Sequence, residues 1–597
     1  MRNIIDIMEK VYKKTDFDFR EYANPKDELS HLFEQWVDYY KMKYAICRAI
    51  KPKRILEIGV RYGYSAISFL KAAPYASYLG IDNDSATFGG SIGAFQWAKK
   101  ITEKYKADFL LSDTQKLTSL PGEFYDLIHI DGQQDGDGTF HDLEMALEKG
   151  NFILVDGFFW STENMLSSTY FMKKYSDFFE YAVIVPGYAG DLLIKTKDRA
   201  RNIFSDKSKN YLYLKNWYNK NYYLTVCKGY ENFTESNGLV IDDRLRAVYS
   251  IADPQPDESI LDIGCGRGEL AYVLSKSGCN VVGLDYSNDA IEIAKKTYGQ
   301  CQLKNLELIC IDVLDYNTER KFDKIIASDV FEHIEQDMLA KVIEKVLELL
   351  KEDGSFIVHT YPNLLKYKYG HSKKRNQAKA CGSYIPLNPR SFYEDLMHIN
   401  EFTPARLRNA LRSRFKHTLT WVNQYPDIAG SLNKKYTKSD FMNADSIFSI
   451  ATNSVLSKEK VLASMMQTEI DRNEISIRIE TKFGSLQLLP SRLVNLNLII
   501  HNNCKERLAS FEPYPVYLSY HWVNEKGEII IHDGIRTALN IPILPGRYLD
   551  TFINIMTPDK PGKYYLQITM VQENCFWFEK YIEGLPLQLE TLIKHTV

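Results

Sequence analysis

Residues 261–269, with the sequence LDIGCGRGE, constrain the fold of this chain more than any other segment. The segment follows an apolar run and precedes a helical pattern, so it predicts a strand, a tight turn and a helix. Gly264, Gly266 and Gly268 permit positive φ and let the backbone approach a ligand closely. The next apolar strand pattern ends in Asp285, 21 positions after Gly264. An acid at that place can accept both hydroxyls of a ribose, so a nucleoside site in a Rossmann-like α/β domain is predicted.

The spacing of the glycines separates two classes of nucleoside-binding protein. The dinucleotide fingerprint is G-x-G-x-x-G, whereas this chain has G-x-G-x-G. That spacing resembles the class I methyltransferases, whose ligand is S-adenosylmethionine (SAM). Three further features agree in order: a short strand pattern ending in Asp312, a fourth strand ending at Asp329, and the hydrophobic-Glu-His signature at 331–333. The alternative is an unrelated doubly wound fold with glycines at these places by chance.

The resemblance implies a set of cofactor-binding residues in this second domain. Asp285 is expected to bind the ribose, and Asp312 the adenine amino group. The expected set is Asp262, Gly264, Gly266, Gly268, Asp285, Asp312 and Asp329.

A second copy of the pattern lies upstream. Residues 54–65 repeat the order of strand, acid, glycine and helix, with Gly59 standing 205 positions before Gly264. The chain therefore resembles two methyltransferase domains in tandem rather than a short-period repeat. The cofactor residues expected here are Glu57, Gly59, Gly63, Asp82 and Asp113.

The upstream copy resembles the metal-assisted O-methyltransferases of the macrocin and cephalosporin-tailoring type. Asp131 and Asp156 match that pattern, but Gln134 stands where the family has a histidine, and Gly157 where it has a second carboxylate. Magnesium needs several oxygen ligands, so we expect no metal site and regard Asp131 and Asp156 as weak Mg²⁺ candidates. An acid of the loop 135–137 is the alternative ligand. Whether this first domain is active stays open.

Composition limits the class of protein. The chain has 597 residues, a net charge of −3, 45% hydrophobic and 25% charged residues, which is typical of several globular domains. Nothing indicates nucleic acid as the main partner. The 9 cysteines form no C-x-x-C pair, which favours reduced thiols and a cytoplasmic location. We expect no signal peptide and no integral membrane segment.

The expected domain boundaries follow from changes of pattern along the chain. Residues 1–230 form the first methyltransferase-like domain with a helical lead-in, and 231–430 the second, with a substrate cap. Residues 431–473 are predicted to be a helical linker. From 474 to 597 the pattern changes to short alternating strands with Pro-Gly turns, typical of an all-β sandwich.

The strand and turn strings of this last segment resemble a β-sandwich module appended to bacterial surface-glycan enzymes, and more distantly the O-antigen-binding domain of polysaccharide exporters. Tyr520 and Trp522 share one sheet face by the period of two. They either contact sugar or fill the core, and the core is the more common place for such rings.

Two histidines are candidates for the general base that a sugar hydroxyl needs. His398 is the first choice, because the segment 398–403 resembles the His-x-x-Glu-x-Thr stretch of glycan-associated methyltransferases. His333 is the second, with helix capping or packing as its alternative. The basic run 371–375 either holds a diphosphate or is a solvated loop.

These observations together predict a cytoplasmic methyltransferase that O-methylates a sugar of a cell-surface polysaccharide or its precursor. The expected partners are a glycan, a nucleotide-linked sugar or a lipid-linked glycan, with peripheral association to glycan-assembly machinery. The alternatives are a small-molecule or quinone-type methyltransferase, and a glycan-binding scaffold with a structural methyltransferase-like domain. The sequence leaves the sugar, its hydroxyl and the oligomeric state open.

Overall fold

The computed structural model describes residues 2–87, 89–198, 217–301, 303–423 and 427–594. The chain divides into two compact units. Unit 1 consists of Met1–Asn210 and His371–Leu396, and unit 2 of Tyr211–Gly370 and Met397–Val597.

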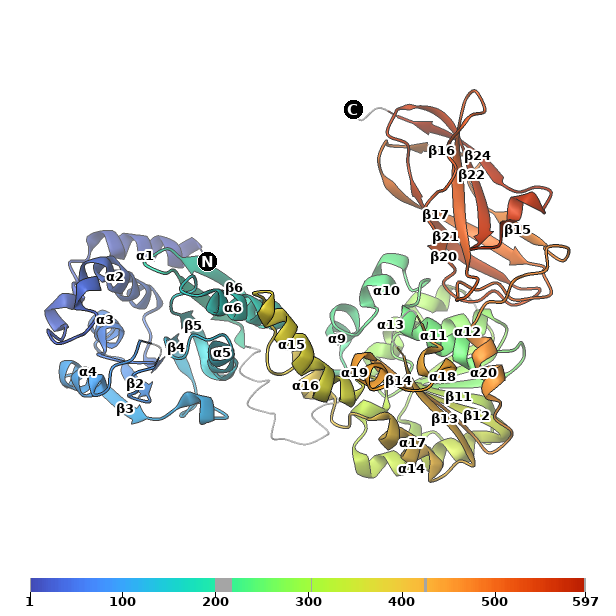
Figure 1. Cartoon of the computed structure of the whole chain (residues 1–597). Helices are drawn as coiled ribbons and strands as arrows, with labels where there is room; N and C mark the ends of the chain where they lie inside the picture. The colour runs from blue at the N-terminus through green and yellow to red at the C-terminus, as the bar shows by residue number, and fades with distance from the viewer. Residues whose placement is uncertain (1, 88, 199–216, 302, 424–426, 595–597) are drawn as a thin grey trace. The chain divides into compact units, whose positions relative to one another are not determined.

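Unit 1 is built on a sheet with the strand order β3-β2-β1-β4-β5-β7-β6 (Figure 1). Its first five strands are parallel, and β7 is antiparallel to both of its neighbours. Four of the five residues of β1 are fully buried, as expected of a central strand that helices cover on both faces. The strands are β1 (Arg54–Ile58), β2 (Ser77–Asp82), β3 (Lys106–Leu111), β4 (Tyr125–Ile130), β5 (Gly150–Val155), β6 (Phe179–Val185) and β7 (Asp191–Thr196). The helices that matter for the site are α1 (Arg2–Lys14), α2 (Phe33–Ile50), α3 (Tyr64–Ala72), α4 (Ala94–Thr102), α5 (Asp137–Lys149) and α6 (Thr162–Lys174).

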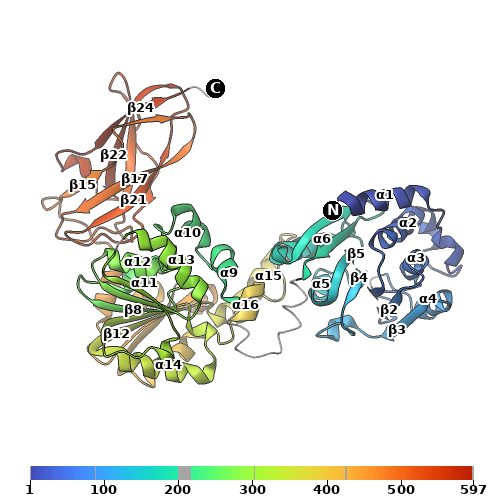
Figure 2. The ribbon, with the colours of Figure 1, turned by 180° about the vertical axis from the view of Figure 1, so that it is seen from behind.

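Unit 2 contains a second sheet of the same topology, in the order β10-β9-β8-β11-β12-β14-β13. Figure 2 shows α11, α12 and α13 on one side of this sheet and α14 on the other. The expectation of two Rossmann-like methyltransferase folds is confirmed. The strands are β8 (Ser259–Ile263), β9 (Asn280–Asp285), β10 (Leu306–Cys310), β11 (Phe322–Ser328), β12 (Leu350–Thr360), β13 (His417–Asn423) and β14 (Ser446–Thr452). The helices are α9 (Lys220–Thr225), α10 (Tyr230–Ser236), α11 (Asp243–Ala252), α12 (Glu269–Lys276), α13 (Asn288–Tyr298), α14 (Gln336–Leu349) and α17 (Pro404–Arg412).

The prediction of a helical linker over 431–473 is wrong in its middle. Ser446–Thr452 is the strand β14, buried at every residue and hydrogen-bonded between β12 and β13. The second methyltransferase fold therefore extends well past residue 430. Three short helices flank this strand in the sequence: α18 (Gly430–Asn433), α19 (Lys438–Asn443) and α20 (Lys458–Ser464). The apolar run of the strand is short and stands among polar residues, so the sequence did not indicate a strand there.

The expected boundary at residue 230 also differs from the structure. Helices α9 and α10 belong to unit 2. They pack near its glycine turn because Arg267 donates to the backbone carbonyls of Tyr223 (2.5 Å) and Lys228 (2.9 Å).

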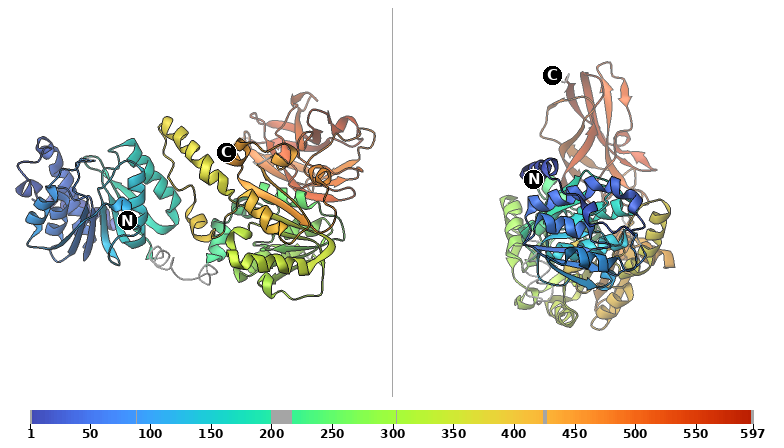
Figure 3. Two further views of the ribbon diagram at one scale, coloured as in Figure 1. Left: turned by 60° about the horizontal axis from the view of Figure 1, so that its bottom comes forward. Right: turned by 90° about the vertical axis from the view of Figure 1, so that its left-hand side faces the viewer.

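The segment His371–Leu396 belongs to unit 1, although the chain on both sides of it belongs to unit 2. It begins with α15, drawn in yellow in Figures 1 and 3. Arg375 Nη2 donates to Asp137 Oδ2 at 2.5 Å, and the ring of Phe392 packs on that of Phe178 with centroids 4.7 Å apart. We expected this stretch in the cap of the second domain. Its aromatic and charged partners lie in unit 1 instead. The helices of the segment are α15 (His371–Ala380) and α16 (Phe392–Met397).

The C-terminal part of unit 2 is the expected all-β region. One sheet has the order β15-β17-β21, and the other β16-β24-β22-β18-β19. Inward-facing residues such as Leu498, Trp522 and Ile553 are almost fully buried and form the core. The main strands are β15 (Ile477–Glu480), β16 (Ser485–Leu488), β17 (Leu493–Asn502), β18 (Val516–Asn524), β19 (Ile529–Ile531), β21 (Tyr548–Met556), β22 (Gly562–Gln572) and β24 (Leu587–Ile593). Across the described ranges, none of the helices has the length and hydropathy of a membrane span.

Candidate active sites

The glycine turn of unit 2 joins β8 to α12 and has the conformation that its sequence predicts. Gly264, Gly266 and Gly268 all have positive φ, of 68°, 53° and 81°. A Cβ atom on Gly264 would lie 2.6 Å from the side chain of Val330. Only glycine fits this turn without strain, and the turn leaves backbone amides at the edge of the sheet.

Asp285 closes the other side of this edge at the end of β9. Its carboxylate accepts the backbone N–H groups of Gly266 (3.0 Å) and Ser287 (2.8 Å). Burial raises the pKa of Asp285 to about 6, although these hydrogen bonds and one from Tyr223 oppose the rise. The acid is thus fixed against the glycine turn, in the place where the sequence predicts a ribose ligand.

The two other predicted acids on this side take different positions. Asp262 lies inside β8 and is 2% exposed; its Oδ2 atom has no hydrogen-bond partner. Burial, with the nearby charges of Asp285 and Glu269, raises its pKa to about 8. Asp312 follows β10 and accepts the N–H of Leu314 at 3.1 Å, which caps a short helical turn. Their roles toward a cofactor stay predictions.

Asp329 lies just beyond β11 in an ion-pair cluster. Its carboxylate contacts Arg244 of α11 at 2.5 Å and the Nδ1 atom of His359 at 2.9 Å. Burial opposes ionisation, but the charges of Arg244 and His359 outweigh it and hold the pKa of Asp329 below its ordinary value. Its φ of +54° is rare for a side chain other than glycine. The cluster holds it there.

The structure brings the two predicted catalytic histidines together, although 64 residues separate them. The rings of His333 and His398 lie 4.9 Å apart in an edge-to-face arrangement. The Nδ1 atom of His333 lies 3.0 Å from the carbonyl oxygen of Met397, so it carries the proton and donates. Burial and the neighbouring His398 lower the pKa of His333 to about 3. The Nδ1 atom of His398 has no hydrogen-bond partner and lies 3.8 Å from Glu401.

Sequence reasoning missed an aromatic wall beside these histidines. Tyr218, just before α9, contacts the rings of Tyr222, Tyr286 and His333, with centroids 5.4 to 5.6 Å apart. Tyr223 lies against the glycine turn, 3.5 Å from the position of a Cβ on Gly266. The run of tyrosines before residue 224 was the available signal, but it lay in a stretch that we expected to belong to the first domain.

The site of unit 1 has the same frame with one substitution. Gly59 and Gly63 have φ of 82° and 78°, and a Cβ on Gly59 would lie 1.9 Å from the carbonyl oxygen of Asp131. Arg61, with φ of 48°, occupies the position of the middle glycine, and its guanidinium pairs with Asp27 at 2.5 Å. The side-chain pair holds a left-handed conformation that glycine would adopt freely.

A cavity of about 420 Å³ opens beside this turn. Asp82 and Asp113 line it, as the sequence predicts for ribose and adenine contacts. The Oδ2 atom of Asp82 accepts the N–H groups of Val60 (2.7 Å) and Arg61 (2.9 Å). Other walls come from the lead-in and from the loops after β4, β5 and β6. They include Trp36, Tyr39, Tyr40, Asp131, Gln134, Asp156, Trp160 and Tyr188.

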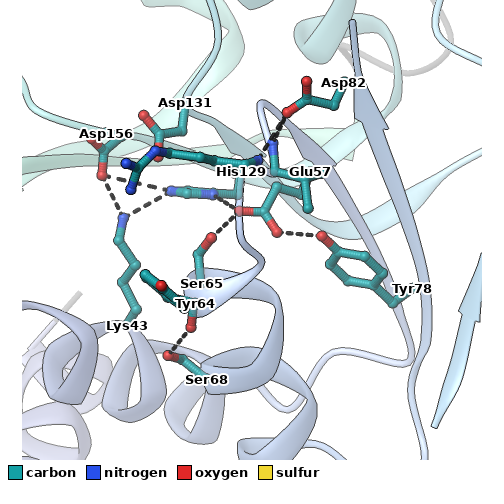
Figure 4. Close-up of polar contacts among 12 residues, drawn as sticks. Lys43, Glu57, Tyr64, Ser65, Ser68, Tyr78, Asp82, His129, Asp131 and Asp156 are labelled. Atoms are coloured by element: carbon teal, nitrogen blue, oxygen red, sulfur yellow. Dashed lines mark hydrogen bonds and ion pairs between the residues drawn. The ribbon is translucent and has the colours of Figure 1, made fainter. Parts of the chain in front are cut away.

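Glu57 lies in a buried polar network (Figure 4). Its carboxylate accepts hydrogen bonds from Ser65, Tyr78 and the Nδ1 atom of His129. Burial raises the pKa of Glu57 to about 7, against the opposing effect of these hydroxyls and of Lys43. Its predicted contact with a cofactor stays a prediction, and its observed role is to orient His129.

The weak metal candidates of unit 1 lie beside a lysine that sequence reasoning did not single out. Donor atoms of His129, Asp131 and Asp156 all lie within 4.8 Å of one another. Lys43 of α2 reaches this group, and its Nζ atom lies 2.7 Å from Asp156 Oδ1 and 2.8 Å from His129 Nε2. The ammonium lies beside two of these three donors, and the expected absence of a metal site stays a prediction.

The basic run 371–375 begins the helix α15 and is not the solvated loop that was one of its two predicted roles; its contact with a diphosphate stays a prediction. The sandwich aromatics Tyr520 and Trp522 have the core role. Arg375 pairs with Asp137, inside unit 1. Tyr520 and Trp522 are 1% and 0% exposed and fill the sandwich core. Trp577 is half-buried and packs against His521, with centroids 4.8 Å apart.

Comparisons with known proteins agree with this architecture. Residues 254–418 match a family model described as a methyltransferase domain, and residues 56–154 match a second model of the same description. Fold and family models together define two class I methyltransferase domains in this chain, and SAM is the methyl donor of that class.

Curated relatives share part of the chain. A malonyl-[acyl-carrier protein] O-methyltransferase of Priestia megaterium is 32% identical over 159 residues, which cover 25% of this chain and 54% of that protein. An (S)-coclaurine N-methyltransferase of Papaver somniferum is 30% identical over 115 residues, covering 19% and 32%. A solved structure of the plantazolicin methyltransferase BpumL with SAH has 15% identity and a TM-score of 0.27, covering 42% of this chain and 98% of that chain. This chain spans 32% to 54% of the length of these curated relatives.

Proposed function

We propose that the chain is a SAM-dependent methyltransferase whose main activity resides in unit 2. One observation carries the proposal: the glycine turn, Asp285 and the pair His333 and His398 belong to one methyltransferase fold. SAM transfers its methyl group without a metal when a nucleophile is aligned with the methyl carbon and water is excluded. A hydroxyl nucleophile needs a base to remove its proton.

The surroundings of the two histidines favour His398 as this base. His333 has its Nδ1 proton bound to Met397 and a pKa of about 3, so it is a weak acceptor of protons. Glu401 lies 3.8 Å from His398 and can stabilise the imidazolium that forms when His398 takes the proton. His333 then orients His398 through their ring contact.

The proposed acceptor is a hydroxyl of a sugar in a cell-surface polysaccharide or its precursor. The resemblance of the C-terminal sandwich to glycan modules supports it, as does the group formed by Trp577, His521 and His532, whose rings lie 4.6 to 5.4 Å apart. An aromatic face with polar neighbours is suited to stacking on a sugar ring. With all 9 cysteines unpaired, the proposal includes the cytoplasm as its location.

A small molecule is the second candidate acceptor. The curated relatives favour it, since they include the (S)-coclaurine N-methyltransferase and the ubiquinone biosynthesis O-methyltransferase of Bos taurus, 31% identical over 128 residues. A third alternative, a glycan-binding scaffold, predicts SAM binding without turnover.

Incubation with labelled SAM separates the three. The full chain is given a glycan extract, a set of quinones and phenols, and a set of benzylisoquinolines, and label is counted in each acceptor fraction. The glycan proposal is supported if label enters the glycan and its amount falls in Trp577→Ala. The amount should stay unchanged in Tyr581→Ala, at an exposed position nearby. Label only in the small acceptors would refute the glycan, and no label with tight SAM binding would support the scaffold.

A further inference from the structure

Lys43 is a fully buried cation in unit 1. Its side chain has 0% exposure, which is rare for lysine unless its charge is paired. The ammonium lies 2.7 Å from Asp156 Oδ1, 2.8 Å from His129 Nε2 and 3.2 Å from Asp191 Oδ2. An ammonium has three N–H donors, and these three acceptors account for all of them.

An aromatic ring and an oriented histidine also surround the ammonium of Lys43. Tyr39, one turn earlier on α2, places its ring face 4.5 Å from the Nζ atom, which is a favourable position for a cation. His129 is held with its Nε2 atom toward the lysine, because its Nδ1–H donates to Glu57 at 2.9 Å. With its Nδ1 proton donated to Glu57, the ring directs its Nε2 atom to the ammonium as an acceptor.

Two of these acceptors are also members of a group with metal-binding spacing. Donor atoms of His129, Asp131 and Asp156 lie within 4.8 Å of one another. Imidazole nitrogen and carboxylate oxygen are ligands that Mn²⁺ and related ions accept. A divalent ion bound by all three would compete with the ammonium for Asp156 and His129.

We propose that Lys43 is the resident cation of this site and that it replaces a divalent metal ion there. Its single charge offsets one negative charge of the pair Asp156 and Asp191, and its N–H groups donate to both carboxylates. Lys43 also acts as a positioning residue, because its hydrogen bond holds the side chain of Asp156, which lines the cavity. Removal of the ammonium leaves the imidazole of His129 and the carboxylates of Asp131 and Asp156 as a donor set for a divalent ion.

Manganese binding tests this replacement without reference to the methyl acceptor, so its outcome is independent of the proposed function. Mn²⁺ is titrated into the full-length wild type, Lys43→Ala, and Lys43→Ala combined with Asp156→Asn, and bound ion is followed by electron paramagnetic resonance. Lys53→Ala, at an exposed position, is the matched control. We expect no Asp156-dependent Mn²⁺ site in the wild type and the control, and at least tenfold tighter binding in Lys43→Ala that Asp156→Asn removes. Thermal unfolding should show the same order, with Mn²⁺ raising the Tm of Lys43→Ala alone.

Two results would overturn the proposal. One is a stoichiometric Mn²⁺ site in the wild type that Asp156→Asn abolishes, because the metal and the ammonium would then coexist. The other is a folded Lys43→Ala protein that gains no Mn²⁺ binding. If Lys43→Ala does not fold, the titration of the wild type against Asp156→Asn decides alone: absence of an Asp156-dependent site supports the proposal, and its presence refutes it.

Discussion

The two Rossmann-like sheets share one strand order but surround the ends of their fourth and fifth strands with different chemistry. In unit 1, Lys43 of α2 neutralises Asp156. In unit 2, Arg244 of α11 pairs with Asp329, which also contacts His359. Both cations come from the helix before the first strand. In both sheets a buried cation therefore comes from the same element of the fold, but the acid that it pairs with follows a different strand in each.

The acid of the first strand shows the same divergence. Strand pairing places Glu57 beside His129 in unit 1 and Asp262 beside Ile326 in unit 2. Glu57 has hydrogen bonds from three side chains, whereas Asp262 has a buried oxygen without a partner. An unpaired buried oxygen is costly. A bound ligand or water that reaches Asp262 would remove that cost, while the acid of unit 1 needs none.

The largest expected effect concerns the pair of histidines in unit 2, His333 and His398. His398→Ala should lower turnover about 10²–10⁴-fold, as the loss of a general base does, with little change in SAM affinity. His417→Ala, at an exposed position on β13, is the control and should retain wild-type turnover. Single-turnover kinetics with saturating SAM measure the rate of methyl transfer in each variant. If His398→Ala keeps wild-type turnover while His333→Ala loses it, the base is His333.

The next effect compares Asp285 and Asp82, the two acids that are predicted to bind ribose. Asp285→Ala should cost unit 2 about 2–4 kcal/mol of SAM affinity, because charge-assisted hydrogen bonds to the ribose are lost. Asp82→Ala should do the same for unit 1 alone. Calorimetric titration should show two SAM sites in the wild type and one in each variant. One site in the wild type that Asp82→Ala leaves intact would show that unit 1 does not bind SAM.

The pH dependence of the unit 2 site should be visible near neutrality. The pKa of Asp285 is raised from 3.8 to about 6, so its ionised form, which we expect to accept the ribose hydroxyls, is lost as pH falls through about 6. SAM affinity at this site should fall at most about tenfold per pH unit below that value, as expected for one proton. Asp285→Asn should bind more weakly and independently of pH. Affinity of the wild type that is constant from pH 7 to pH 5 would contradict the raised pKa.

The smallest effect concerns the segment that completes unit 1. Asp137→Asn weakens the pair with Arg375, whose side chains are 44% and 24% exposed; such pairs contribute about 1 kcal/mol or less. Hydrogen exchange of 371–396 should become faster, with little change in overall stability. Asp177→Asn, at an exposed position of unit 1, should leave exchange unchanged. Equal exchange in both variants would show that the other contacts of the segment, such as those of Phe392 and Tyr384 with aromatic rings of unit 1, hold it without the ion pair.

Most of the secondary structure near the two sites could be predicted from sequence, because glycine turns and strand-end acids are local patterns. The segments around Gly59 and Gly264 form the predicted strand, turn and helix. The strand β14 could not be predicted from its short apolar run, because its hydrogen bonds to β12 and β13 form only in the folded sheet. The wall formed by Tyr218 and Tyr222 was likewise assigned to the wrong domain.

The sequence by itself determined the two glycine turns, the acids that face them and the sandwich pattern, since each depends on spacing within a short stretch. Only the tertiary structure decided that His398 meets His333 and that His371–Leu396 joins unit 1. It also decided that Lys43 reaches Asp156, 113 residues away. Such contacts depend on which helix packs on which strand end. A buried charge pairs with a group that lies close to it in space, and no pattern along the chain shows which group that is.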